Sequence, residues 1–281
     1  MVADASMRPA PLAPTVSVRP FANAARVGFL GKRTCSVAPS PPARRRAGPR
    51  VSSAPMTVDA SGHRRAYLEA LLARDVGAAR RAVDDALEAG LPVPDIYLGV
   101  LQPALYEIGR CWAVGGFSVA DEHNATAVTL SVLGMLGPRM RTAPKDGRLA
   151  VVSGSPEERH ALGVQMVADF LEGDGWEVLN LGASTPATDL ARMADTERPD
   201  VVALSTSTPA GLPGAAETVR ALLALDERPL VVLGGQLWHG EARADAATLG
   251  ADLVVDDPRA LVGVLRERFP PLPPDAEERA L

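Results

Sequence analysis

The 281-residue chain has an ordinary globular composition, with 47% hydrophobic and 22% charged residues, and no run of 18 apolar residues that would span a membrane. Its net charge of −5 is uneven, because residues 1–55 carry nine Lys and Arg against one Asp, a net +8, which leaves −13 for the remainder. An acidic globular part disfavours direct nucleic-acid binding, since contacts with phosphate groups need clustered Lys and Arg.

Residues 1–60 are predicted to be a disordered N-terminal extension, because they are rich in Pro, Ala, Ser and Arg and sustain no helical or strand period. The Arg-rich, acid-poor composition is like that of an organelle transit peptide. A gene start placed too far upstream, with Met56 as the true first residue, is the alternative that we favour. The extension lacks the long apolar core of a secretory signal, so we expect a cytoplasmic protein.

Helical spacing of apolar residues begins at about Ser61 and predicts four helices with short connections. The first begins at about Ser61 and carries Leu68, Leu71 and Leu72, and the second runs from Val76 to Ala89. The third opens at Pro94-Asp95 and ends before Gly115-Gly116, and the fourth runs from Ser118 or Val119 to about Leu136. Four helices joined in this way predict an antiparallel bundle over residues 61–140. The polar segment Pro138–Gly147 contains Pro and Gly and is predicted to be a linker.

After Gly147, short apolar runs alternate with helical stretches. The predicted strands are Leu149–Val152, Val178–Leu181, Val201–Leu204, Leu230–Leu233 and Leu253–Val255, and the predicted helices lie near residues 160–173, 186–197, 211–225, 239–249 and 258–268. Strands that are apolar on both faces and separated by helices predict a parallel sheet covered on both sides. The expected fold class is therefore α/β, with the helical bundle as a cap followed by a five-stranded, flavodoxin-like (Rossmann-like) domain over residues 147–268. Residues 269–281 form a Pro-rich, acidic tail.

His160 follows the first predicted strand, and ligands of such sheets bind at the carboxyl ends of the strands. Neutral imidazole is a good ligand for a transition metal. Glu158, two residues earlier, can accept the other ring N–H and set the tautomer, and Gly163 permits close approach of a bulky group. A loop histidine is more often a surface residue, so the spacing alone leaves both interpretations open.

Three motifs in order, Glu158-x-His160-x-x-Gly163, Ser205-x-Ser207 and Gly234-Gly235, resemble the pattern of cobalamin-binding domains. That family includes methionine synthase, corrinoid methyl carriers, mutases and cobalamin-dependent photoreceptors. The resemblance implies that cobalamin binds base-off, with His160 as the lower axial cobalt ligand, oriented by Glu158. It also implies a nucleotide tail lying between the sheet and a helix, beside the second and third motifs, with Arg159 among the cofactor-binding residues. Glu158 stands where Asp is commoner, as in the photoreceptor branch, and Ser207 stands where Leu is frequent.

A second resemblance lies in the predicted cap, where Trp112 is followed after nine residues by Glu122-His123. This looks like the signature of adenosylcobalamin-dependent photoreceptors. It implies that Trp112 packs on the adenosyl group, that Glu122 accepts its hydrogen bonds, and that His123 ligates cobalt once that group leaves. Without the resemblance, Trp112 is equally a core residue and Glu122 a first-turn acid favoured by the helix dipole.

The resemblance therefore implies a stand-alone cobalamin sensor, not an enzyme, which detects light with adenosylcobalamin in transcription control. Photoreceptor relatives carry an N-terminal winged-helix domain, for which residues 1–58 are too short and too rich in proline. We therefore expect signalling through a separate DNA-binding regulator or self-association, with no direct nucleic-acid or membrane binding. The alternative is a corrinoid carrier that presents methylcobalamin to separate methyltransferases, and a third possibility is cobalamin storage or delivery.

Overall fold

The computed structural model describes residues 59–113, 115–238, 246 and 248–270. The expected N-terminal extension, most of the helix predicted near residues 239–249 and nearly all of the acidic tail lie outside the described residues. None of the helices in the described ranges has the length and apolar character needed to cross a bilayer.

Three of the cap helices described by the structure begin at polar side chains that accept backbone N–H groups. The elements of the cap are α1 (Ala60–Leu72), α2 (Val76–Glu88), α3 (Val93–Ile96), the π-helical turn η1 (Tyr97–Leu101), α4 (Gln102–Ala113) and α5 (Val119–Met140). Asp59 and Asp75 accept backbone N–H groups at the starts of α1 and α2. Ser118 and Asp121 form a reciprocal capping box at the start of α5. These local signals account for the agreement between the predicted and observed helix starts.

Two details of the cap differ from the sequence prediction. The third predicted helix is interrupted by η1, a π-helical turn, which is rare and has no simple sequence signature. The last helix continues beyond Leu136 and through Pro138 to Met140, so the linker begins at Arg141 rather than at Pro138. A proline inside a helix removes one backbone donor and crowds the carbonyl one turn earlier. Burial of Gly137 and Met140 holds this last turn in place nonetheless.

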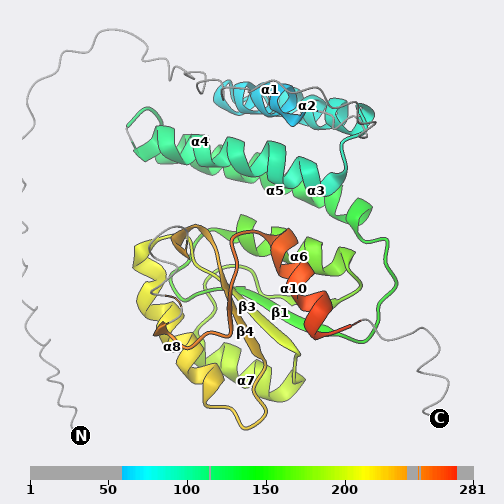
Figure 1. The fold of residues 1–281 in the computed structure, drawn as a ribbon. Helices are drawn as coiled ribbons and strands as arrows, with labels where there is room; N and C mark the ends of the chain where they lie inside the picture. The colour runs from blue at the N-terminus through cyan, green and yellow to red at the C-terminus, as the bar shows by residue number, and fades with distance from the viewer. Residues whose placement is uncertain (1–58, 114, 239–245, 247, 271–281) are drawn as a thin grey trace, which may run out of the picture. The chain divides into compact units, whose positions relative to one another are not determined.

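The second domain contains a five-stranded, wholly parallel sheet, as predicted. Its strands are β1 (Leu149–Gly154), β2 (Glu177–Asn180), β3 (Val201–Ser205), β4 (Leu230–Gly234) and β5 (Leu253–Val254), in the order β2-β1-β3-β4-β5. This is the flavodoxin-like order. Helices α6 (Ala161–Gly173) and α10 (Pro258–Arg268) pack on one face, and α7 (Ala187–Glu197) and α8 (Leu212–Leu223) pack on the other (Figure 1).

Alternate strand residues divide between two hydrophobic clusters. Val152, Ala203 and Val232 belong to the cluster that includes α6 and α10, whereas their neighbours Val151 and Val202 belong to the cluster that includes α7 and α8. The strand order reverses between β1 and β3, because β2 lies on one side of β1 and β4 lies beyond β3. The loops that leave β1 and β3 therefore diverge, and a crevice at their carboxyl ends is the expected ligand site.

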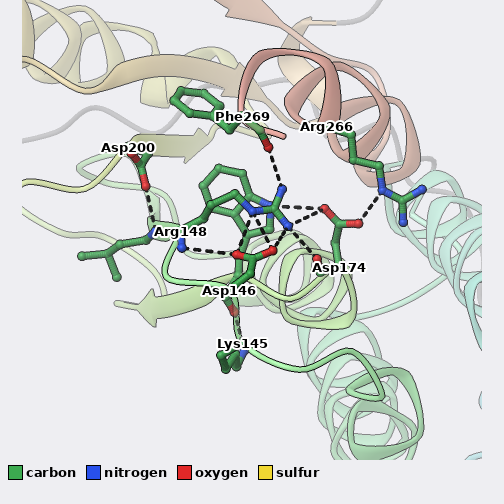
Figure 2. Close-up of polar contacts among 9 residues, drawn as sticks. Lys145, Asp146, Arg148, Asp174, Asp200, Arg266 and Phe269 are labelled. Atoms are coloured by element: carbon green, nitrogen blue, oxygen red, sulfur yellow. Dashed lines mark hydrogen bonds and ion pairs between the residues drawn. The ribbon is translucent and has the colours of Figure 1, made fainter. Parts of the chain in front are cut away.

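Buried Arg148 anchors the opposite, amino-terminal end of the sheet (Figure 2). Its guanidinium pairs with Asp146 at 2.5 Å and Asp174 at 3.4 Å, and it donates to the Phe269 carbonyl at 3.1 Å. Asp174 follows α6 and Phe269 follows α10, so one side chain ties together the ends of both helices. Arg266 of α10 also donates to Asp174, at 2.5 Å. The two helices are thereby fixed relative to the sheet at the ends remote from the crevice.

Candidate cofactor site

A cavity of about 720 Å³ lies at the carboxyl ends of β1, β3 and β4, between these strands, α6, α10 and the cap helices α4 and α5. Its volume falls in the range of roughly 300–1,000 Å³ that is usual for small-molecule sites. The side chains that line its deep part are apolar and come from the sheet and the two covering helices: Val152, Ala203, Val232, Leu162, Met166 and Leu261. The cavity therefore continues as an apolar slot between the sheet and α6 and α10.

Three glycines of the predicted motifs line the cavity, and one of them, Gly235, is required by its backbone conformation and close packing. The first turn of α6 lies close to the end of β3, so that a Cβ on Gly163 would lie only 3.2 Å from the Ser205 hydroxyl oxygen. Gly235 has a φ of +106°, and a Cβ there would lie 2.4 Å from the Thr206 carbonyl oxygen. A Cβ on Gly234 would meet only ordinary contacts, the nearest at 3.6 Å from Val255. These positions keep the wall of the slot free of side chains.

Glu158 is buried and joins the loop after β1 to the loop after β3. Its Oε1 accepts the backbone N–H of His160 at 2.8 Å and lies 2.5 Å from His160 Nδ1. Its Oε2 accepts the backbone N–H of Ser207. Because an ionised carboxylate only accepts hydrogen bonds, Nδ1 is the protonated nitrogen and Nε2 keeps its lone pair. His160 precedes the first residue of α6, its side chain is 50% exposed, and it lines the cavity, so this imidazole suits a metal ligand.

The charges of this pair are mutually stabilised. Burial opposes ionisation of Glu158, but hydrogen bonds from His160 and from the Ser207 amide outweigh it and lower the pKa of the carboxyl. The hydrogen bond to Glu158 raises the pKa of His160, burial opposes that effect, and the charge of Glu122 from the cap adds to it. Because the pKa of His160 is raised, a proton begins to compete with a metal for the imidazole at a higher pH than for an ordinary histidine.

The cap contributes Trp112, Glu122 and His123 to the same cavity. Trp112 is 48% exposed, so it is not a core residue. Glu122 accepts a hydrogen bond from the Thr126 hydroxyl at 2.8 Å, and its other oxygen lies 3.8 Å from His123 Nε2. The His123 side chain is 74% exposed. Trp112 lies near the end of α4, whereas Glu122 and His123 lie near the start of α5, directly after its capping box.

The structure brings nearly all of the sequence-predicted residues to one cavity. Those that line it are Trp112, Glu122, His123, Arg159, His160, Gly163, Ser205, Ser207, Gly234 and Gly235. Glu158 lies behind His160 instead, in contact with its ring. Sequence reasoning missed Gln102 and Tyr106, which also line the cavity and are joined by a hydrogen bond of 3.1 Å. Their spacing of four residues on the helix that carries Trp112 was the available signal.

These residues fit a corrinoid. Within the described ranges, no three His, Cys, Asp or Glu side chains gather as a metal cluster. A corrin ring supplies four nitrogen ligands itself, so a single imidazole with an available Nε2 is a sufficient protein ligand. The apolar slot suits a nucleotide tail, and the aromatic surface of Trp112 suits an organic group on the other face of a ring.

Known proteins resemble both parts of the chain. One model of the B12 binding domain matches residues 148–262, and a second matches residues 63–136. The chain is 32% identical over 190 residues to the HTH-type transcriptional repressor CarH of Myxococcus xanthus and 36% identical over 127 residues to the repressor CarA of that organism. The matches cover 66% and 44% of this chain, but only 61% and 41% of the relatives.

The fold has a counterpart among solved structures. The monomethylamine corrinoid protein of Methanosarcina barkeri superposes with a TM-score of 0.65 over 72% of this chain and 96% of that protein, at 17% identity. Both domains and their order are thus those of corrinoid proteins, and His160 lies at the cavity between the sheet and the cap. The chain binds cobalamin and belongs to the cobalamin-binding (B12-binding) domain family, with a helical cap followed by a Rossmann-like domain.

Proposed function

We propose that this protein is a light sensor that holds adenosylcobalamin base-off, with His160 as the lower axial ligand of the cobalt. The observation that carries the proposal is the pairing of His160 with buried Glu158 on one side of the cavity, while Trp112 and the Glu122-His123 pair line it from the cap. Bound adenosylcobalamin supplies a cobalt–carbon bond that visible light can break.

On the lower side, the chain's own groups hold and orient the ligand. Glu158 fixes the ring of His160 and, in the neutral imidazole, places the proton on Nδ1 so that Nε2 has its lone pair. The amide of Ser207 holds Glu158 in turn. The slot beside Ser205 and Gly234 accepts the nucleotide tail, because its walls are apolar and carry little side-chain bulk.

On the upper side, Trp112 offers an aromatic surface that packs against adenosine and excludes water. Glu122 accepts hydrogen bonds from ribose hydroxyls. His123 is our candidate for an axial ligand after the upper group has left, since it lines the cavity, whereas His63 on α1 does not. Trp112 would hold the cap against the upper group of a bound cofactor, so the position of the cap would depend on whether that group is present.

The output of the sensor is proposed to be transcription control through a separate DNA-binding regulator or through self-association. The names of the curated relatives, both HTH-type transcriptional repressors, support the link to transcription. The net charge of −13 on residues 56–281 supports an indirect route, because such a surface repels phosphate groups. On this proposal the protein is a sensor and performs no catalysis of its own.

The deciding experiment is a spectrum. Protein is purified with adenosylcobalamin in darkness, and absorption and oligomeric state are recorded before and after illumination. We expect base-off cobalamin in the dark and a new spectrum after light. His160→Ala should lose the imidazole-ligated spectrum, whereas His123→Ala should bind normally in the dark and differ only after light. His63→Ala is the matched control. A dark complex whose spectrum and assembly ignore light would refute the sensor.

A methyl carrier is the second candidate, since the structural counterpart is a corrinoid protein named for monomethylamine. The cap distinguishes the two functions, because a methyl group offers nothing for Trp112 or Glu122 to hold. Titration with adenosylcobalamin and methylcobalamin in darkness, with wild type and Trp112→Ala, separates them. Tighter binding of the adenosyl form that disappears in the variant favours the sensor. Equal affinity for both forms favours the carrier, and light-stable assembly with either form favours storage.

A further inference from the structure

A group of polar contacts joins the cap to the Rossmann-like domain at the end of the cap that is remote from Trp112. The hydroxyl of Tyr97, in η1, donates to Asp169 of α6 at 2.7 Å. Arg141, which follows α5, lies 3.3 Å from Asp169 and donates to Glu172 at 2.7 Å. Asp95 of α3 pairs with Arg259 of α10 at 2.6 Å. One end of the cap is therefore attached to both helices that cover the cofactor face of the sheet.

Asp169 is the centre of this attachment. Its side chain has no exposed surface, and a buried carboxylate is costly unless it is hydrogen-bonded and paired. Tyr97 donates to Oδ2, while Gln165 at 3.0 Å and Arg141 donate to Oδ1. Two of the three donors come from the cap or its linker. A small displacement of this end would break these bonds before water could replace them, so this end resists gradual movement.

Close backbone packing supports the same contact. A Cβ on Gly137 of α5 would lie 2.9 Å from Asp169 Oδ1, so α5 approaches the carboxylate closely only because this residue is glycine. A Cβ on Gly173 of α6 would lie 3.0 Å from the Met140 carbonyl oxygen. Tyr97 also meets Phe170 edge to face, with ring centroids 6.0 Å apart. This end of the cap is thus packed as a protein interior is, with no room for sliding.

The end of the cap that faces the cavity is different in character. Trp112 and His123 are about half and three-quarters exposed, and both line the cavity instead of packing into the domain below. Pockets of roughly 300–1,000 Å³ enclose drug-sized ligands. Adenosylcobalamin is larger than such ligands, so in this cavity it would contact Trp112 and His123 on the cap side.

We propose that the Tyr97–Asp169 junction is the fixed pivot of the cap, and that ligand entry and release swing the end that carries Trp112 and His123. The π-helical turn η1 connects the pivot to α4, and such turns recur at functional positions in helices. The junction also extends to the end of β2, because Asn180 donates to Gln165 at 3.0 Å and accepts the backbone N–H of Gly182 at 3.0 Å. That the entering ligand is a cobalamin rests on the proposed function, whereas the pivot does not.

The test measures distances between labelled residues by pulsed electron paramagnetic resonance. A genetically encoded spin-label residue replaces exposed Asp195 of α7 together with either Arg139, near the pivot, or Asn124, near the cavity. In wild-type apoprotein we expect a narrow distribution of distances between the labels at positions 139 and 195. Tyr97→Phe and Asp169→Asn should each lose that narrow distribution. Tyr67→Phe is the matched control, because it also removes a buried tyrosine hydroxyl, bonded to Thr129 at 2.9 Å, but entirely within the cap.

Loading with adenosylcobalamin in darkness supplies the second arm. We expect the 124–195 distance to shift and the 139–195 distance to stay. The pivot is refuted if Tyr97→Phe and Asp169→Asn keep the wild-type 139–195 distribution, or if loading moves Arg139 as far as Asn124. A failure to take up cobalamin would count against the proposed function and not against the pivot, since the apoprotein comparison needs no ligand.

Discussion

Replacement of Glu158 by glutamine tests how the lower ligand is prepared, because it changes charge and donor pattern with almost no change in shape. The native carboxylate accepts three N–H groups: the amide and Nδ1 of His160 and the amide of Ser207. A glutamine side chain has one acceptor oxygen and one NH2 group. If the oxygen faces His160, the NH2 group meets the Ser207 donor. If the amide is reversed, the NH2 group faces Nδ1 and favours the proton on Nε2, the atom that we propose binds cobalt.

The expected loss follows from these contacts. A hydrogen bond to a charged group contributes about 1.5–3 kcal/mol, and a buried donor left without a partner costs about 1–3 kcal/mol. Part of this loss lowers the stability of the apoprotein, and the remainder appears on metal binding. Removal of a group that orients a metal-binding histidine typically weakens metal affinity about 10–100-fold. We therefore expect Glu158→Gln to weaken cobalamin binding by about that factor, which is roughly 1.4–2.7 kcal/mol.

The assay is an absorption titration of apoprotein with cobalamin, which reports both affinity and imidazole ligation. Glu157→Gln is the matched control, because it removes the same charge from the adjacent, exposed residue. It should bind cobalamin as the wild type does. If Glu158→Gln matches Glu157→Gln in affinity and spectrum, Glu158 does not prepare His160 and the reasoning is wrong.

Three further outcomes are expected. Gly235→Ala places a Cβ 2.4 Å from the Thr206 carbonyl oxygen at a φ of +106°, so thermal unfolding and cobalamin titration should both show a loss, of at least about 1–3 kcal/mol in stability from backbone strain; wild-type behaviour would contradict it. Arg148→Met removes the arginine partner of the largely buried Asp146 and leaves Asp174 with Arg266 alone, so it should cost about 3–5 kcal/mol in urea unfolding. Arg198→Met, whose side chain is 67% exposed, should cost at most about 1 kcal/mol. Equal losses would contradict the network in Figure 2. Cobalamin affinity should fall as pH falls through the pKa of His160, which the hydrogen bond to Glu158 raises, because protonation occupies Nε2. Affinity that rises on acidification would count against imidazole ligation.

Much of the fold could be predicted from local patterns. The apolar strands β1, β3 and β4 are buried on both faces, so their residues form short continuous runs that are visible in the sequence. Helix starts at Asp75 and Ser118 could be predicted because the capping contacts reach only three residues along the chain. The motif around His160 could be placed for a related reason, since the loop after the first strand of a doubly wound sheet has a fixed position in the fold.

The remaining features depend on contacts between residues distant in the sequence. The choice between a surface histidine and a prepared ligand depends on Glu158 reaching the amide of Ser207, 49 residues further along. The exposure of Trp112 toward a cavity cannot be distinguished from core packing by helical spacing alone. The π-helical turn brings Tyr97 to Asp169, which lies 72 residues away. Helix α5 continues past Pro138 to Met140, where Gly137 packs against that same carboxylate. Propensity and periodicity act over a few residues, so the sequence alone determined the order of elements and the ligand motif. The shape of the cavity and the attachment of the cap were decided by packing in three dimensions.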